Sequence, residues 1–370
     1  MRAVRPASVL VAIVLLLSCG RDAPRARVGI AVEPGWYPAV RMALADLGDV
    51  PLDIVADSTR DVQLAPAAIE YAAWLADSGV AVVVGHSGSR GSVAASNVYR
   101  RRGVVQLAPI ATSRALTRDG SPAFALVPDD SAEGAFIAQF VDEGLGAGRV
   151  ALLYHHDEYG LGIRDGVAAE LAVRGVTIVD ERFFAPEGTP SGAQRVERLL
   201  AAALRMRPDV IVLGARVAET RLVAGSLRRQ GRRIPVVAGD GSYVLPPSRA
   251  DRDLRDLEGV HIVRFWGPDR DAAGAAFARR FEERYGYPPE QSEAFTYDAV
   301  MLVGVAARAG ARSADEFRRF FTGLGSDQLV YTGLGGRYMF VQGRPRFSTI
   351  EITTVRDGVM VPRPVTGVVP

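Results

Sequence analysis

The stretch that decides the fold is VAVVVGHSGSRGSVAASNVYRRRGVVQLAPIATS, residues 80–113. It holds two short runs of branched apolar residues, at 80–84 and 104–107, on either side of a helix-like segment at 92–102. Buried parallel strands have this near-continuous Val, Ile and Leu composition, and a helix between two of them forms a crossover unit. The stretch therefore predicts one strand–helix–strand unit of an α/β protein, with a polar loop after each strand.

Strand-like and helix-like segments alternate along most of the chain. Further strands are expected at residues 27–31, 52–55, 149–154, 177–184, 210–213, 235–238 and 260–263. Helices are expected between them at residues 65–77, 132–143, 162–174, 193–205 and 218–230. Later in the chain, helices follow one another at 272–285, 293–309 and 314–324, with extended segments near 337–341 and 348–355. This is more than one sheet holds comfortably, so the sequence predicts two doubly wound α/β lobes with parallel sheets covered on both faces.

The composition is that of an ordinary globular protein. Of the 370 residues, 48% are apolar and 23% are charged, which excludes a disordered chain and a multi-pass membrane protein. The 44 basic residues are all arginine, and with 42 acidic residues they leave a net charge of +2. A chain without lysine cannot form a Schiff base or place a lysine on the phosphates of a P-loop. The sequence has no basic patch interleaved with aromatic residues, so we expect no nucleic-acid partner.

The only cysteine, Cys19, closes an N-terminal targeting pattern in which two arginines precede an apolar run at residues 7–17. The run is well short of the roughly 20 residues needed to cross a bilayer. The pattern resembles a bacterial lipoprotein signal. This resemblance implies a signal peptide at 1–18, lipidation of Cys19, a tether at 19–26, and export to the periplasmic or extracytoplasmic face of a cell membrane. With one cysteine, no internal disulfide can form.

Polar and aromatic residues gather just past the carboxyl ends of the expected strands. In chain order they are Trp36, Ser89, Thr112, Tyr159 and Asp240. In open α/β sheets this edge is where ligands bind, so two such edges facing each other predict a cleft. The hydroxyls of Ser89 and Thr112 and the amides of nearby helix starts suit an anionic group, and Asp240 suits a cation.

Several short segments together carry a resemblance to a known family. They are residues 57–61, 85–89 with 95–99, 108–113 with 116–117, 157–160, 239–241 and 296–300. In order and spacing they resemble the substrate-binding proteins of branched-chain amino acid ABC transporters, the leucine/isoleucine/valine-binding type. The resemblance implies a type I periplasmic binding protein fold of two doubly wound Rossmann-like lobes joined by a three-crossover hinge.

The resemblance also implies where the lobes divide. The crossovers fall near residues 127–128, 264–265 and 346–347. The N-terminal lobe is then expected at 27–127 plus 265–345, and the C-terminal lobe at 128–264 plus 346–370.

Motif by motif, the resemblance assigns ligand-binding roles. Ser89, Ala111 and Thr112 fall where the amino acid carboxylate is held. Tyr159 falls on the aromatic residue that closes the pocket from the other lobe, and Asp240 on the acid that takes the ammonium. A zwitterion held by both lobes would favour the closed state.

Two further residues are expected at the cleft. Trp36 belongs to the loop after the first strand, and Arg216 falls near a position where the family has an aromatic residue. An arginine there would favour an anionic ligand or one with a second carboxylate. Five candidates also have a purely structural alternative. Ser89 could cap the following helix, and Asp240 could be a turn residue. Tyr159 could cover the start of the next helix, Arg216 could be a solvated surface side chain, and Trp36 could lie at the edge of the core.

Catalytic interpretations have less support from the sequence than a ligand-binding one. The motif around Ser87 comes within one residue of the G-x-S-x-G nucleophile elbow, but Ser89 stands where the last glycine is needed. His86, adjacent to Ser87, points to the opposite side in extended backbone. His155 and His156 lack the i, i+4 spacing that places two imidazoles on one ion, so no metal is expected.

The expected function is that of an exported, lipid-anchored, monomeric solute-binding protein. It would capture an amino acid or related small carboxylate by hinge closure and deliver it to an ABC permease, without a cofactor and without catalysis. Two alternatives stay open. One is a ligand sensor or regulatory lipoprotein of the same fold, and the weaker one is a serine hydrolase that uses Ser87.

Overall fold

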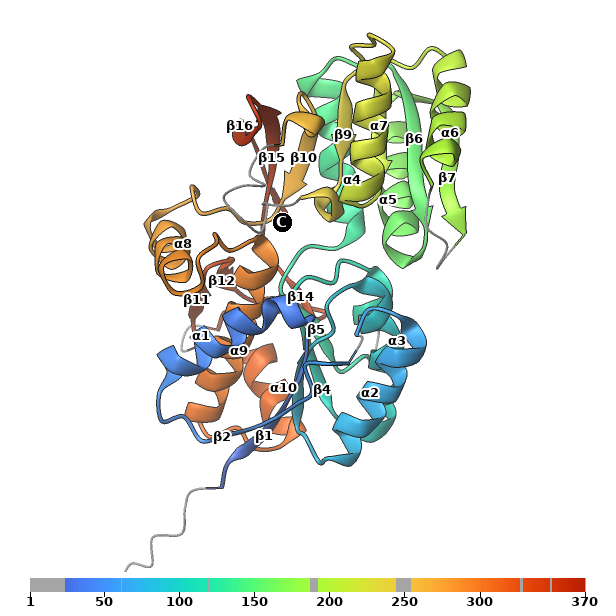
Figure 1. The fold of residues 1–370 in the computed structure, drawn as a ribbon. Coiled ribbons are helices and arrows are strands. Elements are labelled where there is room, and N and C mark those ends of the chain that lie inside the picture. The colour runs from blue at the N-terminus through green and yellow to red at the C-terminus, as the bar shows by residue number, and fades with distance from the viewer. Residues whose placement is uncertain are drawn as a thin grey trace, which may run out of the picture.

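The structure is a computed structural model that describes residues 24–60, 62–118, 120–186, 192–243, 254–326, 329–346 and 348–369. Two lobes, each built on its own sheet, lie one above the other (Figure 1). The expected signal peptide and Cys19 lie outside the described residues. Among the residues within these ranges, no helix combines the length and the apolar character needed to cross a membrane.

The N-terminal lobe is built on a five-stranded parallel sheet of order β2-β1-β3-β4-β5. Its strands are β1 (Ala26–Ala31), β2 (Leu52–Ala56), β3 (Val82–Gly85), β4 (Val105–Ala108) and β5 (Ala123–Ala125). Strand β3 is buried along its whole length because helices cover both faces of the sheet. These helices are α1 (Tyr37–Leu47), α2 (Ala65–Asp77), α3 (Ser89–Arg102), α8 (Ala272–Tyr285), α9 (Gln291–Arg308) and α10 (Ala314–Gly323).

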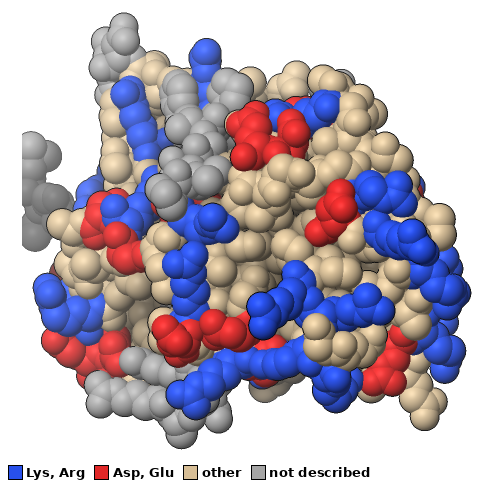
Figure 2. Space-filling view, turned by 90° about the horizontal axis from the view of Figure 1, so that it is seen from above, with Lys and Arg blue, Asp and Glu red and all other residues tan. Residues whose placement is uncertain are grey.

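The C-terminal lobe is built on a seven-stranded sheet of order β16-β15-β10-β9-β8-β6-β7. Its strands are β6 (Arg149–His156), β7 (Thr177–Pro186), β8 (Val210–Gly214), β9 (Val236–Ala238), β10 (His261–Arg264), β15 (Ser348–Arg356) and β16 (Val359–Val369). Its helices are α4 (Asp130–Gln139), which continues as a π-helical turn (Phe140–Gly144), α5 (Glu158–Arg174), α6 (Ala193–Arg205) and α7 (Val217–Arg229). In the view from above in Figure 2, arginine and acidic side chains are interspersed among uncharged residues.

The chain passes between the two sheets three times: from β5 to α4, from β10 to α8, and from β14 (Arg344–Pro345) to β15. Strand β14 pairs with β13 (Phe340–Val341), and β11 (Tyr331–Gly333) pairs with β12 (Gly336–Tyr338). Arg344 donates from Nη1 to the carbonyl oxygens of Ala111 at 2.8 Å and Val127 at 3.3 Å. This guanidinium therefore ties β14 to the segment that leaves the first sheet.

The α/β prediction is confirmed, but several details differ. Helices α2, α6 and α8 have the expected bounds, but α1 and the three-residue strand β5 were not expected. The C-terminal sheet is not wholly parallel, because β15 pairs antiparallel with both β10 and β16. Helix α5 starts at Glu158 rather than at 162, since Asp157 caps it by accepting the Gly160 N–H at 3.0 Å.

Candidate functional site

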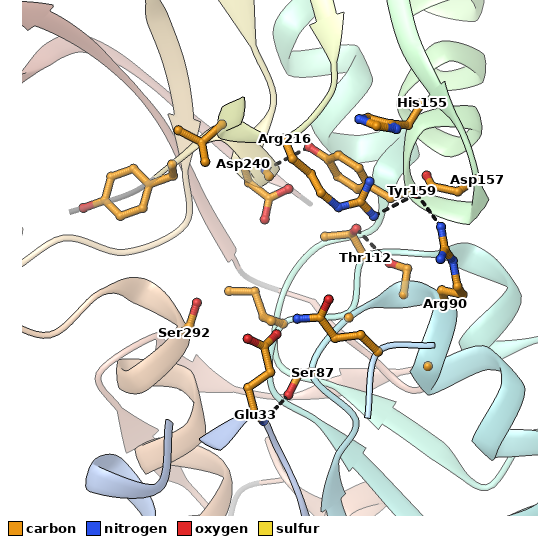
Figure 3. A pocket seen from close by; sticks show the side chains of 18 of the residues that line it. Glu33, Ser87, Arg90, Thr112, His155, Asp157, Tyr159, Arg216, Asp240 and Ser292 are labelled. Carbon is orange, nitrogen blue, oxygen red and sulfur yellow. Dashed lines mark hydrogen bonds and ion pairs between the residues drawn. The ribbon is translucent and has the colours of Figure 1, made fainter. Parts of the chain in front are cut away.

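A cleft of about 600 Å³ lies between the lobes, where the carboxyl ends of strands from both sheets meet (Figure 3). The N-terminal lobe contributes Trp36, Ser89 and Thr112, and the C-terminal lobe contributes Tyr159, Arg216 and Asp240. Six of the seven predicted ligand-binding residues thus line one cavity. Their part in binding a ligand stays a prediction.

The N-terminal wall of the cleft is rich in hydrogen-bond donors. Ser89 is the first residue of α3, and the preceding Gly88 has no side chain with which to cap the helix. Residues 88–91 line the cleft, so the N-terminal turn of this helix faces it. The Ser89 hydroxyl accepts the Ser113 N–H at 3.1 Å and lies 3.4 Å from the Thr112 hydroxyl. Ser89 is therefore not the helix cap that the alternative interpretation required.

The C-terminal wall centres on Asp240, which lies two residues after the end of β9 and is only 7% exposed. Its Oδ1 lacks a hydrogen-bond partner among the described residues. Burial raises the pKa of Asp240 to about 6, although hydrogen bonds with Glu133 and Tyr159 act in the opposite direction. The Tyr159 hydroxyl accepts the Gly241 N–H at 2.9 Å, so the ring is fixed beside the carboxyl group.

The glycines on both sides of Asp240 are needed for this packing. A Cβ at Gly239 would lie 2.5 Å from the Tyr159 hydroxyl, and one at Gly241 would lie 2.8 Å from the Tyr159 ring. Contacts this short do not occur for real side chains, so any larger residue would push Tyr159 away from the acid. The Gly-Asp-Gly sequence is therefore a close-approach site as well as a turn.

One carboxylate joins two arginines at the rim of the cleft. Asp157 Oδ2 lies 3.2 Å from Arg90 Nη2 and 2.8 Å from Arg216 Nη2 (Figure 3). Although burial alone would raise the pKa of Asp157, the positive charge of Arg216 and the Gly160 amide leave it below its ordinary value. The Arg216 guanidinium also lies over the Tyr159 ring, 5.8 Å from its centre. Arg216 is thus an ion-pair partner rather than a free surface arginine.

Ala111 is the predicted site residue that does not line the cleft. Its side chain is fully buried in a small apolar cluster with Ala108 and Leu116. Its carbonyl oxygen accepts from Arg344 at 2.8 Å. Ala111 therefore lies behind Thr112, at the segment that leads to the other lobe.

The sequence interpretation missed several charged residues at this site. Arg90, Asp157 and Glu33 line the cleft, and Glu133 lies behind Asp240. Asp157 carries a recognisable signal, a helix-capping aspartate ahead of a helical segment. Glu133 carries a weaker one, an acid within an otherwise apolar stretch of helix α4.

The hydrolase alternative lacks its catalytic pairing. The Ser87 hydroxyl accepts the Glu33 N–H at 2.6 Å, and His86 Nε2 lies 2.9 Å from the Tyr99 hydroxyl. Within the described ranges, no hydrogen bond joins Ser87 to a histidine nitrogen, which a serine nucleophile needs for activation. The same ranges hold no group of three His, Cys, Asp or Glu residues that could bind a metal ion.

Residues 28–356 match the family described as periplasmic binding protein, which covers both lobes and all the cleft residues named above. The chain belongs to this family. A Leu/Ile/Val-binding protein homolog of Brucella abortus is 25% identical over 293 residues, 77% of this chain and 75% of the relative. The predicted resemblance to the leucine/isoleucine/valine-binding type is therefore confirmed.

Solved structures agree on the fold of this periplasmic binding protein. A leucine-binding protein from Thermotoga maritima superposes with a TM-score of 0.78 at 20% identity, covering 93% of this chain and 98% of the other. A solute-binding protein from Rhodopseudomonas palustris, in complex with 3,4-dihydroxybenzoic acid, gives 0.77 at 16% identity, with coverage of 93% and 98%. The two-lobed type I fold is thus established.

Proposed function

We propose that this periplasmic binding protein captures an amino acid or a closely related amine-bearing carboxylate in its cleft and delivers it to an ABC permease. The observation that carries the proposal is the pairing of two unlike walls. Asp240 presents an unpartnered carboxyl oxygen on one lobe, and Ser89, Thr112 and the start of α3 present donors on the other.

The two walls suit the two ends of a zwitterion. The ligand carboxylate would accept hydrogen bonds from the hydroxyls and first-turn amides of the N-terminal wall. The ligand ammonium would donate to Asp240 beside the Tyr159 ring, where an aromatic face also favours a cation. Since neither lobe offers both sets of contacts, the ligand would stabilise the closed arrangement of the lobes.

The names of the relatives support a small organic ligand but do not choose its class. The Brucella abortus relative is named for leucine, isoleucine and valine, whereas the Rhodopseudomonas palustris structure holds a phenolic acid that lacks an amine. The buried carboxyl of Asp240 supports an amine, because an acid without a cation would leave this charge uncompensated.

We further propose the domain division and anchoring expected from the sequence. The hinge would comprise residues 127–128, 264–265 and 346–347, of which Phe347 lies outside the described residues. The lobes would be 27–127 plus 265–345 and 128–264 plus 346–370. Lipidation at Cys19 would hold a monomer at the membrane. A sensor of the same fold would use the same cleft, and only the presence of a partner permease separates the two roles.

The proposal is tested by binding of matched compounds to the protein produced without residues 1–19. Leucine is compared with 4-methylpentanoate, which lacks the amine, and with isoamylamine, which lacks the carboxylate; the other amino acids complete the panel. A true ligand at 100 times its dissociation constant should stabilise the fold by roughly 2.7 kcal/mol in a thermal shift assay.

The matched variants are Asp240→Asn in the cleft and Asp256→Asn, whose carboxylate forms a surface ion pair with Arg221 at 2.9 Å. We expect Asp240→Asn to weaken binding of the amino acid at least about thirtyfold, in line with ~2 kcal/mol for a buried charge partner, and Asp256→Asn to leave it unchanged. Equal binding of amine-free acids, or full affinity in Asp240→Asn, would contradict the proposal.

A further inference from the structure

Asp240 belongs to a buried cluster of three carboxyl groups. Asp130 and Glu133, both on α4, are 1% and 0% exposed, and neither of them lines the cleft. Glu133 Oε1 accepts the Asp240 N–H at 2.6 Å. Asp130 Oδ1, Glu133 Oε2 and Asp240 Oδ1 each lack a hydrogen-bond partner within the described part of the chain. Buried acceptor atoms such as these are satisfied when one of the carboxyl groups is protonated or when a cation binds beside them.

The positive charges near this cluster are already engaged. The positive charge of Arg344 opposes the rise in the pKa of Asp130 that burial causes, but Nη1 of this arginine donates to backbone carbonyl oxygens. The positive charge of Arg216 opposes the rise in the pKa of Asp240 that burial causes, but Arg216 is paired with Asp157 at 2.8 Å and its side chain is 46% exposed. Among the described residues, the Tyr159 hydroxyl on α5 also faces the pair. Acidic groups therefore outnumber the cations that face Glu133 and Asp240.

Two adjoining buried carboxyl groups cannot both carry a charge at low cost, so such a pair retains one proton. Burial and then the charge of Asp240 raise the pKa of Glu133 well above its ordinary value, which agrees with this geometry. A carboxyl group on Glu133 can donate its proton to Asp240 and still accept the Asp240 N–H through its other oxygen.

We propose that Glu133 is a positioning residue for the cationic end of the ligand, that it shares one proton with Asp240 in the empty cleft, and that this proton leaves when the ligand binds. The inference rests on the proposed function, because it concerns the same site. In the step, the O–H bond of the shared proton breaks and the proton passes to solvent. The ligand arrives as an ammonium and stays one, so one positive charge replaces another beside two carboxylates.

This exchange would make the site selective for charge. A ligand without a cation would leave the proton in place and would meet a neutral carboxyl rather than a second carboxylate. An amine-bearing ligand would bind more tightly as the pH rises, because the proton that it must displace is held less firmly. Affinity should rise by up to about tenfold per pH unit while one whole proton is released.

The test is calorimetric titration of the protein with the amino acid that it binds, repeated in buffers of different ionisation enthalpy. The dependence of the heat on the buffer gives the number of protons released per ligand. Glu133→Gln is the decisive variant. The glutamine amide keeps an acceptor for the Asp240 N–H and a donor for the Asp240 carboxylate, but it carries no titratable proton. Asp298→Asn is the control, a buried acid outside the cleft, on α9, whose pKa is raised to about 6 by burial.

We expect the unmodified protein and Asp298→Asn to release about one proton near pH 7, with affinity that rises with pH. Glu133→Gln should bind the same amino acid with a flat pH profile and no proton release. Zero release by the unmodified protein, or equal release by Glu133→Gln, would overturn the inference while leaving the proposed function standing.

If no amine-bearing ligand binds, the proposed function fails. A measurement on the ligand-free protein then still tests whether Glu133 and Asp240 share a proton. The infrared carbonyl band of a protonated carboxyl at pH 7 should lose intensity in Glu133→Gln and not in Asp298→Asn. A band that does not depend on Glu133 would overturn the shared proton.

Discussion

Arg90 on the N-terminal lobe contacts Asp157 on the C-terminal lobe, with 3.2 Å between Nη2 and Oδ2. The Asp157 side chain is 2% exposed, and Arg216 of its own lobe approaches the same oxygen at 2.8 Å. Figure 3 shows the three side chains together beside the cleft. This ion pair therefore joins the two lobes beside the cleft.

Replacing Arg90 should loosen the lobes. In Arg90→Gln, Asp157 keeps Arg216 but loses its partner across the cleft. We expect the closed form to lose about 1 kcal/mol, so that ligand affinity falls about fivefold and the ligand-free protein becomes less compact. Calorimetry and small-angle X-ray scattering measure the two effects. The matched control is Arg102→Gln on the same helix, whose pair with Asp77 at 3.0 Å is exposed on both sides; an equal loss in both variants would sink the idea.

Removing the shared carboxylate should change ligand preference. Asp157→Asn keeps an oxygen for the Gly160 N–H and so preserves the helix cap, but it removes the carboxylate charge that lies beside Arg90 and Arg216. We expect the ratio of glutamate to leucine affinity to increase at least about tenfold, because the cleft wall at Arg216 then carries more net positive charge. Competition titrations give this ratio. The double variant Asp157→Asn with Arg216→Gln should reverse most of the gain, and a gain that persists there would rule out Arg216 as its source.

Stability should depend on pH through Glu293, on α9. Burial raises the pKa of this carboxyl to about 7, from an ordinary value of 4.5. The folded state then holds more protons than the unfolded state between these values, so the free energy of unfolding falls as the pH rises through this window. Glu293→Gln should remove up to about 3 kcal/mol of that fall. Urea unfolding at pH 5 and pH 8 measures it, with the exposed Glu283→Gln on α8 as control; parallel pH profiles for the Glu293 variant and the unmodified protein would refute the assignment.

Anchoring should depend on Cys19 alone. In the full-length chain, Cys19→Ala removes the only thiol and therefore the acceptor for a lipid. We expect the exported protein to move from the membrane fraction to the soluble fraction, with its ligand affinity unchanged. Cell fractionation followed by titration of the released protein checks both parts. Retention in the membrane fraction would contradict the lipoprotein interpretation.

Local sequence predicted the elements whose signals are local. Helix α2 has the bounds read from the sequence, and β3 is the buried run of valines expected of a central parallel strand. Strand β5 was missed because a strand of three residues is too short to show periodicity, and its hydrogen bonds are made with β4. The antiparallel strand β15 shows the same limit, since strand direction depends on the partner that a segment meets.

The sequence by itself determined the fold class and the strand ends at which a ligand would bind. It also identified residues of both cleft walls, with Ser89 and Thr112 on one and Asp240 on the other. Only the tertiary structure decided what surrounds them. Glu133 and Asp240 are 107 residues apart, and Arg90 and Asp157 are 67 apart, yet each pair is in hydrogen-bond contact. Periodicity and capping act over one or two helical turns, whereas the charge balance of a buried site is set by whichever side chains the folded chain brings within a few ångströms.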